Sequence, residues 1–199
     1  MIYDITQPLF ECVVFPGDEP PIRHTVMSIA KGDICNLTTL SMCAHNGTHV
    51  DAPFHFIDGG KTVDRVPLDR FIGPAFVADH EGEVTAADAE EMMRKAATLC
   101  AESAKKLLIK GKSTVTEEAA RVFAAAGIDL IGNESQTLGP EDAPAAVHRI
   151  LLGAEIVLLE GIRLHSVPEG VYMLNCAPLN LSGADGAPCR AVLMDLNAE

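Results

Sequence analysis

The chain has 199 residues, of which 48% are hydrophobic and 22% charged, and its formal net charge is −13. This composition is typical of a globular domain with a sizeable core, which we place over residues 1–199. The acidic balance argues against nucleic acid and anionic membranes as partners, because both bind clustered Lys and Arg. Without an apolar run of roughly 20 residues or a signal-like N-terminus, the chain is expected to be cytoplasmic and not membrane-bound.

The six cysteines form no CxxC pair. A cysteine metal site therefore lacks its usual spacing. In a cytoplasmic chain we expect these residues to be reduced thiols packed in the core.

The first part of the chain is predicted to be mainly β. Residues 2–6 have a short strand-like pattern, and the segment Phe15-Pro16-Gly17-Asp18 predicts a rigid loop, because Pro fixes φ and Gly frees it. Residues 24–29 and 36–42 are rich in Val, Ile, Thr and Leu and predict two strands. The Lys31-Gly32-Asp33 segment between them predicts a hairpin turn.

Helices and strands alternate in the second part. A capping box at Thr85 opens an Ala-rich helix to about residue 101, the segment 114–117 caps a second helix that ends at Gly127, and a third helix runs from about Asp142 to Gly153. Apolar runs predict further strands at residues 71–78, 107–109, 128–131, 156–159, 171–174 and 191–196. This order predicts an α/β fold, a single domain with a mixed β-sheet core and flanking helices.

One segment stands out chemically, His45-Asn46-Gly47-Thr48-His49-Val50-Asp51-Ala52-Pro53-Phe54-His55. It holds three histidines and one aspartate, and such donors suit a borderline divalent cation. Gly47 and Pro53 disfavour a helix, so we expect a loop that enters a strand. In that strand, His49, Asp51 and His55 would share one face at period two.

Two distant residues are candidates to complete a metal site. His148 lies within the third predicted helix, and Glu160 ends the apolar run at 156–159. A carboxylate at the end of a buried strand is costly unless it is paired or ligated. The residues alone also allow an ordinary surface or core histidine and a paired structural glutamate.

The segment His45-x-Gly47-Thr48-His49-x-Asp51-x-Pro53-x-His55-Phe56 resembles the signature of the metal-dependent cyclase family, which includes bacterial kynurenine formamidase and isatin hydrolase. The resemblance extends over nearly the whole chain. Its other matching parts are the loop 15–18, the pair His148 and Glu160, and the C-terminal segments 167–172, 177–179 and 183–191. It implies the swivelling β/β/α fold of that family and a homodimer or larger homo-oligomer.

The resemblance also implies a ligand set. His45, His49 and Asp51 would hold one divalent ion, and Asp51 would bridge to a second ion held with His148 and Glu160. Two zinc ions are expected, with manganese as the alternative, because imidazole and carboxylate ligands suit both metals.

The reaction implied is hydrolysis of a small-molecule amide by a metal-bound hydroxide, with His55 as the acid/base. The expected activity is that of an arylformamidase of tryptophan catabolism, which hydrolyses N-formylkynurenine-type aryl formamides to formate and an aryl amine. Isatin-hydrolase-like opening of a cyclic amide, or a non-catalytic protein that binds a metal or small molecule, are the alternatives.

Two departures bear on the substrate. The early loop is often Trp-Pro-Gly-Asp in the formamidases, whereas this chain has Phe15 and no Trp. Where many relatives have Asp-Thr-x-Ser, this chain has Glu134-Ser135-Gln136-Thr137. We expect Phe15 to line the substrate pocket, and both changes to affect specificity while leaving the metal chemistry intact.

Overall fold

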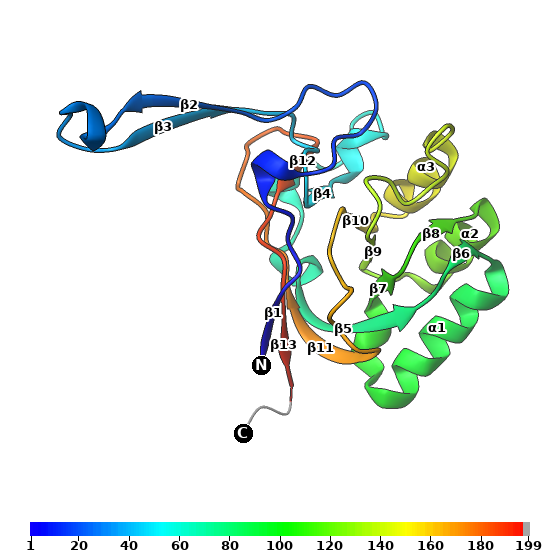
Figure 1. The fold of residues 1–199 in the computed structure, drawn as a ribbon. Helices are drawn as coiled ribbons and strands as arrows, with labels where there is room; N and C mark the ends of the chain where they lie inside the picture. The colour runs from blue at the N-terminus through cyan, green and yellow to red at the C-terminus, as the bar shows by residue number, and fades with distance from the viewer. Residues whose placement is uncertain (197–199) are drawn as a thin grey trace.

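The computed structural model describes residues 1–196 and shows a curled nine-stranded sheet with three helices packed against one face (Figure 1). The last three residues of the expected 1–199 domain lie outside this part. The helices are α1 (Ala86–Leu99), α2 (Glu117–Ala126) and α3 (Ala145–Gly153). In spatial order the strands are β1 (Ile2–Asp4), β13 (Val192–Asp195), β11 (Gly170–Asn175), β5 (Ile72–Asp79), β7 (Lys106–Lys110), β9 (Leu130–Asn133), β10 (Val157–Glu160), β4 (His49–Asp51) and β12 (Gly186–Pro188).

The predicted mixed sheet is confirmed. Strands β5, β7, β9 and β10 are parallel, and the connections between them contain the three helices, as parallel pairing requires. The strands on either side pair antiparallel. Two short strands, β6 (Gly82–Val84) and β8 (Ser113–Val115), form a separate parallel pair.

Both faces of the central strands are buried. In β5, Phe76 and Ala78 belong to the core beneath the helices, whereas Ala75 and Val77 belong to the core on the opposite face. The same alternation sends Leu158 of β10 to the helix side and Leu159 to the other side. The central strands are therefore continuous apolar runs, which is how the sequence revealed them.

The helix ends follow local sequence signals. The Thr85 side chain accepts a hydrogen bond from the Asp88 backbone and the Asp88 carboxylate accepts one from the Thr85 backbone, as the predicted capping box requires. The second helix ends at Gly127, in the left-handed conformation, as predicted. Its N-cap is Thr116, because Thr114 belongs to β8.

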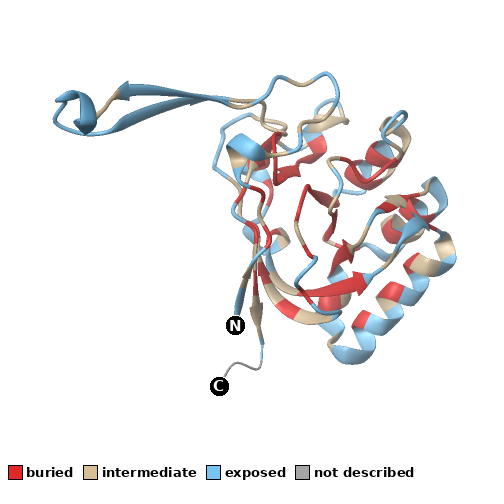
Figure 2. Ribbon diagram, in the orientation of Figure 1, coloured by how far each residue is buried: buried red, intermediate tan, exposed pale blue. Residues whose placement is uncertain are grey.

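A long hairpin projects away from this body (Figure 1). Its strands are β2 (Ile22–Met27) and β3 (Leu37–Ser41), which form a two-stranded sheet with each other. The predicted turn is present, with Gly32 at φ +94° after a short 3₁₀ turn. We call residues 22–41 the arm, and Figure 2 shows it almost entirely exposed.

All six cysteines are free thiols, as expected, but only Cys176 and Cys189 are buried. The expectation that all six pack in the core is therefore wrong, and Cys35 lies exposed in the arm. Within residues 1–196, the structure contains no helix with the length and apolar character needed to cross a membrane.

Candidate metal centre

Two neighbouring antiparallel strands place the first donors. His49 of β4 lies opposite Glu160 of β10, and Asp51 lies opposite Leu158. Val50 points into the core on the far face, so His49 and Asp51 point to the helix side of the sheet. His148 is a buried residue of helix α3, one of the three helices on this face of the sheet (Figure 1). Residues separated by more than one hundred positions are thus brought together by sheet pairing.

These four side chains form a buried polar cluster. His49 Nε2 lies 3.4 Å from Asp51 Oδ1 and 3.5 Å from Glu160 Oε2. His148 Nε2 lies 3.3 Å from Glu160 Oε1 and 3.6 Å from Asp51 Oδ2. All four residues are at most 3% exposed. Two carboxylates this deeply buried require cationic partners.

The histidine rings are oriented by backbone carbonyls. His49 Nδ1 donates to Gly47 O at 3.0 Å, and His148 Nδ1 donates to Pro144 O at 2.9 Å. Each bond directs the Nε2 atom at the carboxylates, the arrangement usual for imidazoles that bind metals.

Two atoms at the centre of the cluster are left over. His49 Nε2 and Asp51 Oδ2 are buried and have no hydrogen-bond partner among residues 1–196. Orphaned buried polar atoms are rare, and two facing inward among histidines and carboxylates fit a missing divalent cation.

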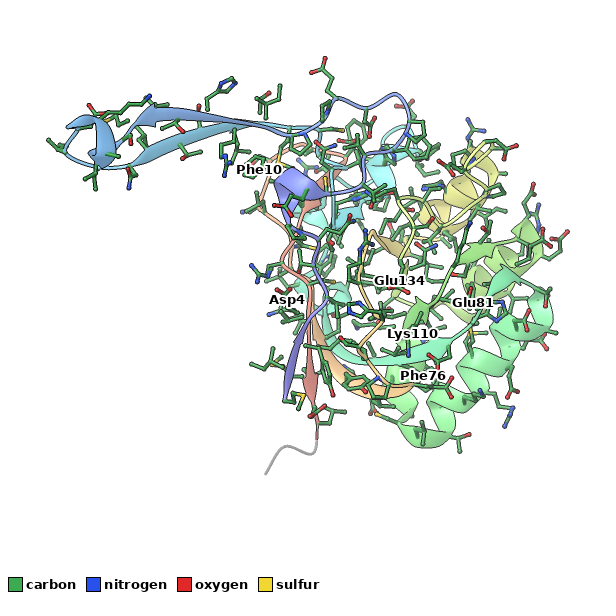
Figure 3. All side chains as sticks on the ribbon, in the orientation of Figure 1. Asp4, Phe10, Phe76, Glu81, Lys110 and Glu134 are labelled. Carbon is green, nitrogen blue, oxygen red and sulfur yellow. The ribbon has the colours of Figure 1, made fainter. Side chains whose placement is uncertain are left out.

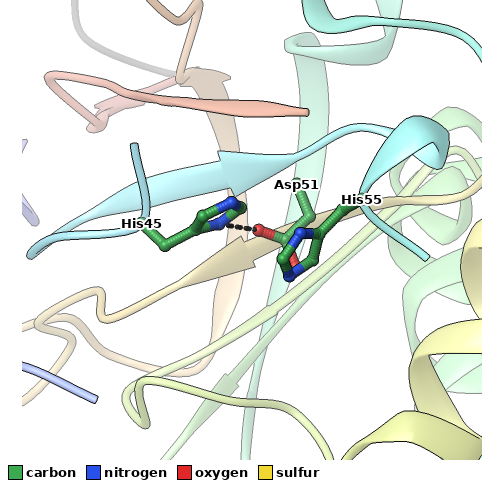
Figure 4. Close-up of side chains that lie close together, drawn as sticks. All are labelled: His45, Asp51 and His55. Carbon is green, nitrogen blue, oxygen red and sulfur yellow. Dashed lines mark hydrogen bonds and ion pairs between the residues drawn. The ribbon is translucent and has the colours of Figure 1, made fainter. Parts of the chain in front are cut away.

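His45 and His55 approach the cluster from the solvent side. His45 Nδ1 lies 2.9 Å from Asp51 Oδ1, and Figure 4 shows the His45 ring directed at this carboxylate beside His55. The two rings stack with their centroids 4.0 Å apart. Donor atoms of His45, Asp51 and His55 form one close group, those of His49, Asp51 and Glu160 form another, and Asp51 belongs to both.

The predicted strand through His55 is wrong. Strand β4 ends at Asp51, and residues Pro53–His55 form a 3₁₀ turn. Pro at the first turn position ends the strand because it fixes φ and cannot donate to the sheet. His55 therefore reaches the site through a turn of the chain and not through strand alternation.

Asp185 was missed as a site residue. Its Oδ2 atom accepts hydrogen bonds from His45 Nε2 at 2.8 Å and from His55 Nδ1 at 3.0 Å. It lies directly before β12, which pairs with β4 and so carries the carboxylate to the two rings. The only signal in the sequence was its place within the segment 183–191 that resembles the cyclase family.

The charges of the cluster shift its pKa values strongly. Burial alone would lower the pKa of His45, but hydrogen bonds to Asp185 and Asp51 raise it to about 11. Burial alone would likewise lower the pKa of His49, but Asp51 and Glu160 raise it to about 9. Burial opposes the ionised form of Asp51, but the hydrogen bond from His45 and the nearby charges of His45 and His49 hold its pKa well below the usual range. In the metal-free protein, protons on the imidazoles balance the carboxylates.

A cavity of about 230 Å³ opens beside this cluster. Its lining includes Phe15, together with Phe56 and Gln136. Glu134 does not line this cavity, since its carboxylate accepts backbone hydrogen bonds from Gly111 and Leu164. Of the segment 134–137, which differs from many relatives, Gln136 and Thr137 line the cavity. Glu134 instead stabilises neighbouring loops through its hydrogen bonds.

Within residues 1–196, both groups of His, Cys, Asp or Glu side chains that are close enough to hold a metal ion contain Asp51. Glu81, Lys110 and Glu134, labelled in Figure 3, lie elsewhere, near the carboxyl ends of central strands. That region forms a separate cavity with Asp79 and His80. It includes no residue of the buried cluster.

Comparison with known proteins identifies the relatives. A family model described as "Putative cyclase" matches residues 3–139. The chain belongs to the cyclase family. Among curated cyclase-family proteins, kynurenine formamidase of Salinibacter ruber is 35% identical, over 92% of this chain and 91% of its own length. Kynurenine formamidase of Sphingopyxis alaskensis is 32% identical, over 98% of each chain.

Solved structures of cyclase-family proteins share the fold. One described as a potential metal-dependent hydrolase with cyclase activity superposes with a TM-score of 0.82 at 29% identity, covering 100% of this chain and 99% of its own. Isatin hydrolase A from Labrenzia aggregata superposes with a TM-score of 0.79 at 22% identity, covering 98% of this chain and 93% of its own. The second likeness is one of fold.

Proposed function

We propose that this protein is a metal-dependent amide hydrolase that acts as an arylformamidase on N-formylkynurenine-type aryl formamides, releasing formate and an aryl amine. The observation that carries the proposal is the buried cluster with two orphaned donor atoms, in a chain 35% identical to a kynurenine formamidase. The inferred place of this reaction is tryptophan catabolism.

Five residues are proposed to hold the metal. His45, His49 and Asp51 would bind one ion, and Asp51 would bridge to a second ion bound by His148 and Glu160. The presence of Asp51 in both donor groups supports its role as the shared ligand, because a carboxylate offers two oxygens. The division of the other ligands between the two ions follows the family resemblance, since the donor atoms of His49 lie closest to those of Asp51 and Glu160. We propose two zinc ions, with manganese as the alternative. A bound divalent cation lowers the pKa of water to near neutrality and so supplies a nucleophile at pH 7.

His55 is proposed as the acid/base that passes a proton to the departing nitrogen. It lines the cavity, and its Nδ1 atom is occupied by Asp185. The Nε2 atom is therefore the nitrogen available for proton transfer. Asp185 is proposed as a positioning residue that fixes this tautomer and also holds His45 Nε2, so that His45 Nδ1 stays directed at the metal site.

The cavity supports an aromatic substrate of modest size. Phe15 and Phe56 line its walls, and apolar rings suit an aryl group. An adjoining cavity of about 200 Å³ shares Phe15 and Gln136 with it, giving room for a substituent beyond the aryl ring.

Two further properties are proposed for the whole protein. We propose a homodimer or larger homo-oligomer, which the resemblance to the family implies. A cytoplasmic location is supported by six free thiols, which a reducing compartment maintains.

The test combines metal analysis of the purified protein with formate release from N-formylkynurenine. We expect about two zinc or manganese ions per chain, and turnover that a chelator removes and added metal restores. A substrate panel should include a cyclic amide, because ring opening yields one product and deformylation yields two. A metal-loaded protein that hydrolyses none of these amides would contradict the proposal and favour a non-catalytic binding role.

A further inference from the structure

Two glutamine side chains meet beside the candidate metal centre, and neither belongs to its proposed ligand set. Gln7 follows β1 and is only 5% exposed, whereas Gln136 lines the cavity of about 230 Å³ beside the buried cluster. Gln7 Nε2 donates a hydrogen bond of 2.7 Å to Gln136 Oε1. A residue of the cavity wall is therefore held by a buried amide.

The backbone groups around this pair fix which atom of each amide is the oxygen. Gln7 Nε2 also donates to Gly161 O at 2.7 Å, and Gln7 Oε1 accepts from the Val13 backbone N–H at 2.9 Å. Because a carbonyl oxygen only accepts and a backbone N–H only donates, the Gln7 amide has one orientation. Gln136 must then turn Oε1 toward Gln7, so its Nε2 atom donates to Gly47 O at 3.0 Å.

The Gly47 carbonyl also anchors one of the proposed metal ligands. It accepts the hydrogen bond of 3.0 Å from His49 Nδ1, which directs His49 Nε2 at the carboxylates. Gln136 and His49 therefore donate to the same oxygen. Gly47 has φ +69°, and a glycine has more backbone freedom than any other residue. A side chain that holds this carbonyl therefore also fixes the direction of the His49 ring.

The Gln7 amide reaches the second ligand-bearing strand in the same way. Gly161 directly follows Glu160 at the end of β10, and Gly161 O accepts hydrogen bonds of 2.7 Å from both Gln7 Nε2 and Thr48 Oγ1. A Cβ atom at Gly161 would lie 2.5 Å from Gln7 Nε2 and from Gly47 O, so the close packing requires a glycine. The two glutamines thus connect the segment before His49 with the residue after Glu160.

We propose that Gln136, held by Gln7, is a positioning residue that orients His49 for metal binding through the Gly47 carbonyl. The shared oxygen keeps the proton of His49 on Nδ1 and leaves Nε2 free as the ligand atom. This inference rests on the proposed metal-binding role of His49, and it assigns a role to two residues outside the ligand set.

His148 provides an internal comparison. Its Nδ1 atom donates to Pro144 O, and the same oxygen accepts the backbone N–H of His148 at 3.2 Å. A backbone hydrogen bond of α3 therefore fixes the carbonyl that anchors His148, whereas a glutamine side chain fixes the carbonyl that anchors His49. Loss of Gln136 should affect the His49 ring and spare the His148 ring.

The test is hydrogen exchange of ring and side-chain N–H groups, observed by NMR on zinc-loaded protein that is isotope-labelled in histidine and glutamine. In the wild type, the Nδ1 protons of His49 and His148 and one Nε2 proton of Gln136 should exchange slowly, because each is hydrogen-bonded. This measurement needs no variant. A Gln136 amide that exchanges as fast as an exposed side-chain amide would overturn the proposal.

The variant Gln136→Met keeps the length of the side chain and removes both of its hydrogen bonds. The His49 Nδ1 proton should then exchange about tenfold faster, while the exchange of the His148 proton is unchanged. Zinc affinity, measured by competition with a chelator, should fall about tenfold, the lower end of the usual effect of losing a group that orients a ligand. Ser135→Ala is the local control and should change neither value, because Ser135 is exposed and adjoins Gln136.

Equal changes at His49 and His148, or an unchanged zinc affinity in Gln136→Met, would overturn the positioning role. Hydrogen exchange is also measured on the metal-free protein, in which His49 Nδ1 donates to the same carbonyl. Failure to bind zinc would contradict the proposed function, whereas the exchange rates without metal still decide whether Gln136 positions His49.

Discussion

Asp51 is the residue on which the geometry of the candidate site converges. One of its oxygens contacts His45 and His49, and the other faces His148 without a hydrogen-bond donor. Its side chain is 1% exposed, so water does not compensate its charge. Around this carboxylate, His55 and Asp185 are partly exposed. The proposed proton transfer would pass through His55, with Asp185 holding its ring.

Replacing His55 with Ala should lower turnover of N-formylkynurenine by about 10²- to 10⁴-fold, the usual contribution of a general acid or base. Metal content, measured on the same preparation, should stay at the wild-type level. His165→Ala is a suitable control, because His165 is exposed and lies outside the cluster. Loss of metal in the His55 variant would instead assign that residue to the ligand set.

Asp185→Asn should lower turnover and weaken metal binding together, because one carboxylate holds both His55 and His45. In a double-mutant cycle with His55→Ala, the effect of Asp185→Asn on turnover should largely disappear, while its effect on metal affinity remains. Fully additive losses in turnover would show that Asp185 does not act through His55.

Asp64→Asn controls for the loop that carries Asp185. The Asp64 carboxylate accepts a hydrogen bond from the Gly183 backbone, in the same loop, but Asp64 belongs to neither donor group. This variant should leave metal affinity and turnover close to those of the wild type.

At the scale of elements, the site depends on three adjacent strands, β10, β4 and β12. Gly186 of β12 lies opposite Asp51 at such close range that a Cβ atom there would sit 2.6 Å from Val50 O and 2.7 Å from His45 Cε1. The glycine is therefore required by the close approach of the two strands.

Gly186→Ala should separate β12 from β4, displace His45 and reduce metal affinity, with a loss of stability measured by thermal unfolding. Gly153→Ala is the matched control at the end of α3, where the new Cβ meets only Ile57 at an ordinary 3.7 Å. If the Gly186→Ala variant binds metal with wild-type affinity, the close approach of β12 and β4 does not require a glycine at this position.

The elements were predictable from sequence where their signals are local. The cap at Thr85 and the stop at Gly127 depend on neighbours a few residues away, and the buried strands are short apolar runs. Strand β12 was missed because Gly186 and Pro188 are depleted in strands. The role of Asp185 was missed because its partners are 130 and 140 positions away. The hairpin was predicted, but its projection from the body is a tertiary property that no local pattern contains.

For the whole molecule, burying carboxylates among histidines couples folding to pH. Metal-free protein keeps His45 and His49 protonated, with pKa values of about 11 and 9 against an ordinary value of 6.5. A raised pKa in the folded state gives stability that is complete below pH 6.5 and is lost as the pH rises through the folded values.

The free energy of unfolding of the metal-free protein should therefore fall between pH 6.5 and about 11. Chemical denaturation at intervals across this window measures it. Metal-loaded protein should be more stable throughout and should show a weaker decline, because a cation replaces the imidazole protons. A metal-free protein whose free energy of unfolding is constant or increases over this pH range would contradict the raised pKa values of His45 and His49.

The pairing of His49 with Glu160 also makes the metal a reporter of correct assembly. A one-residue slip between β4 and β10 would turn His49 and Asp51 toward the opposite core and away from Glu160. A molecule with this register error would keep much of its secondary structure. Its His49 and Asp51 side chains, however, would no longer lie beside Glu160. Tightly bound metal per chain therefore counts the molecules in a preparation whose strands have paired in the native register.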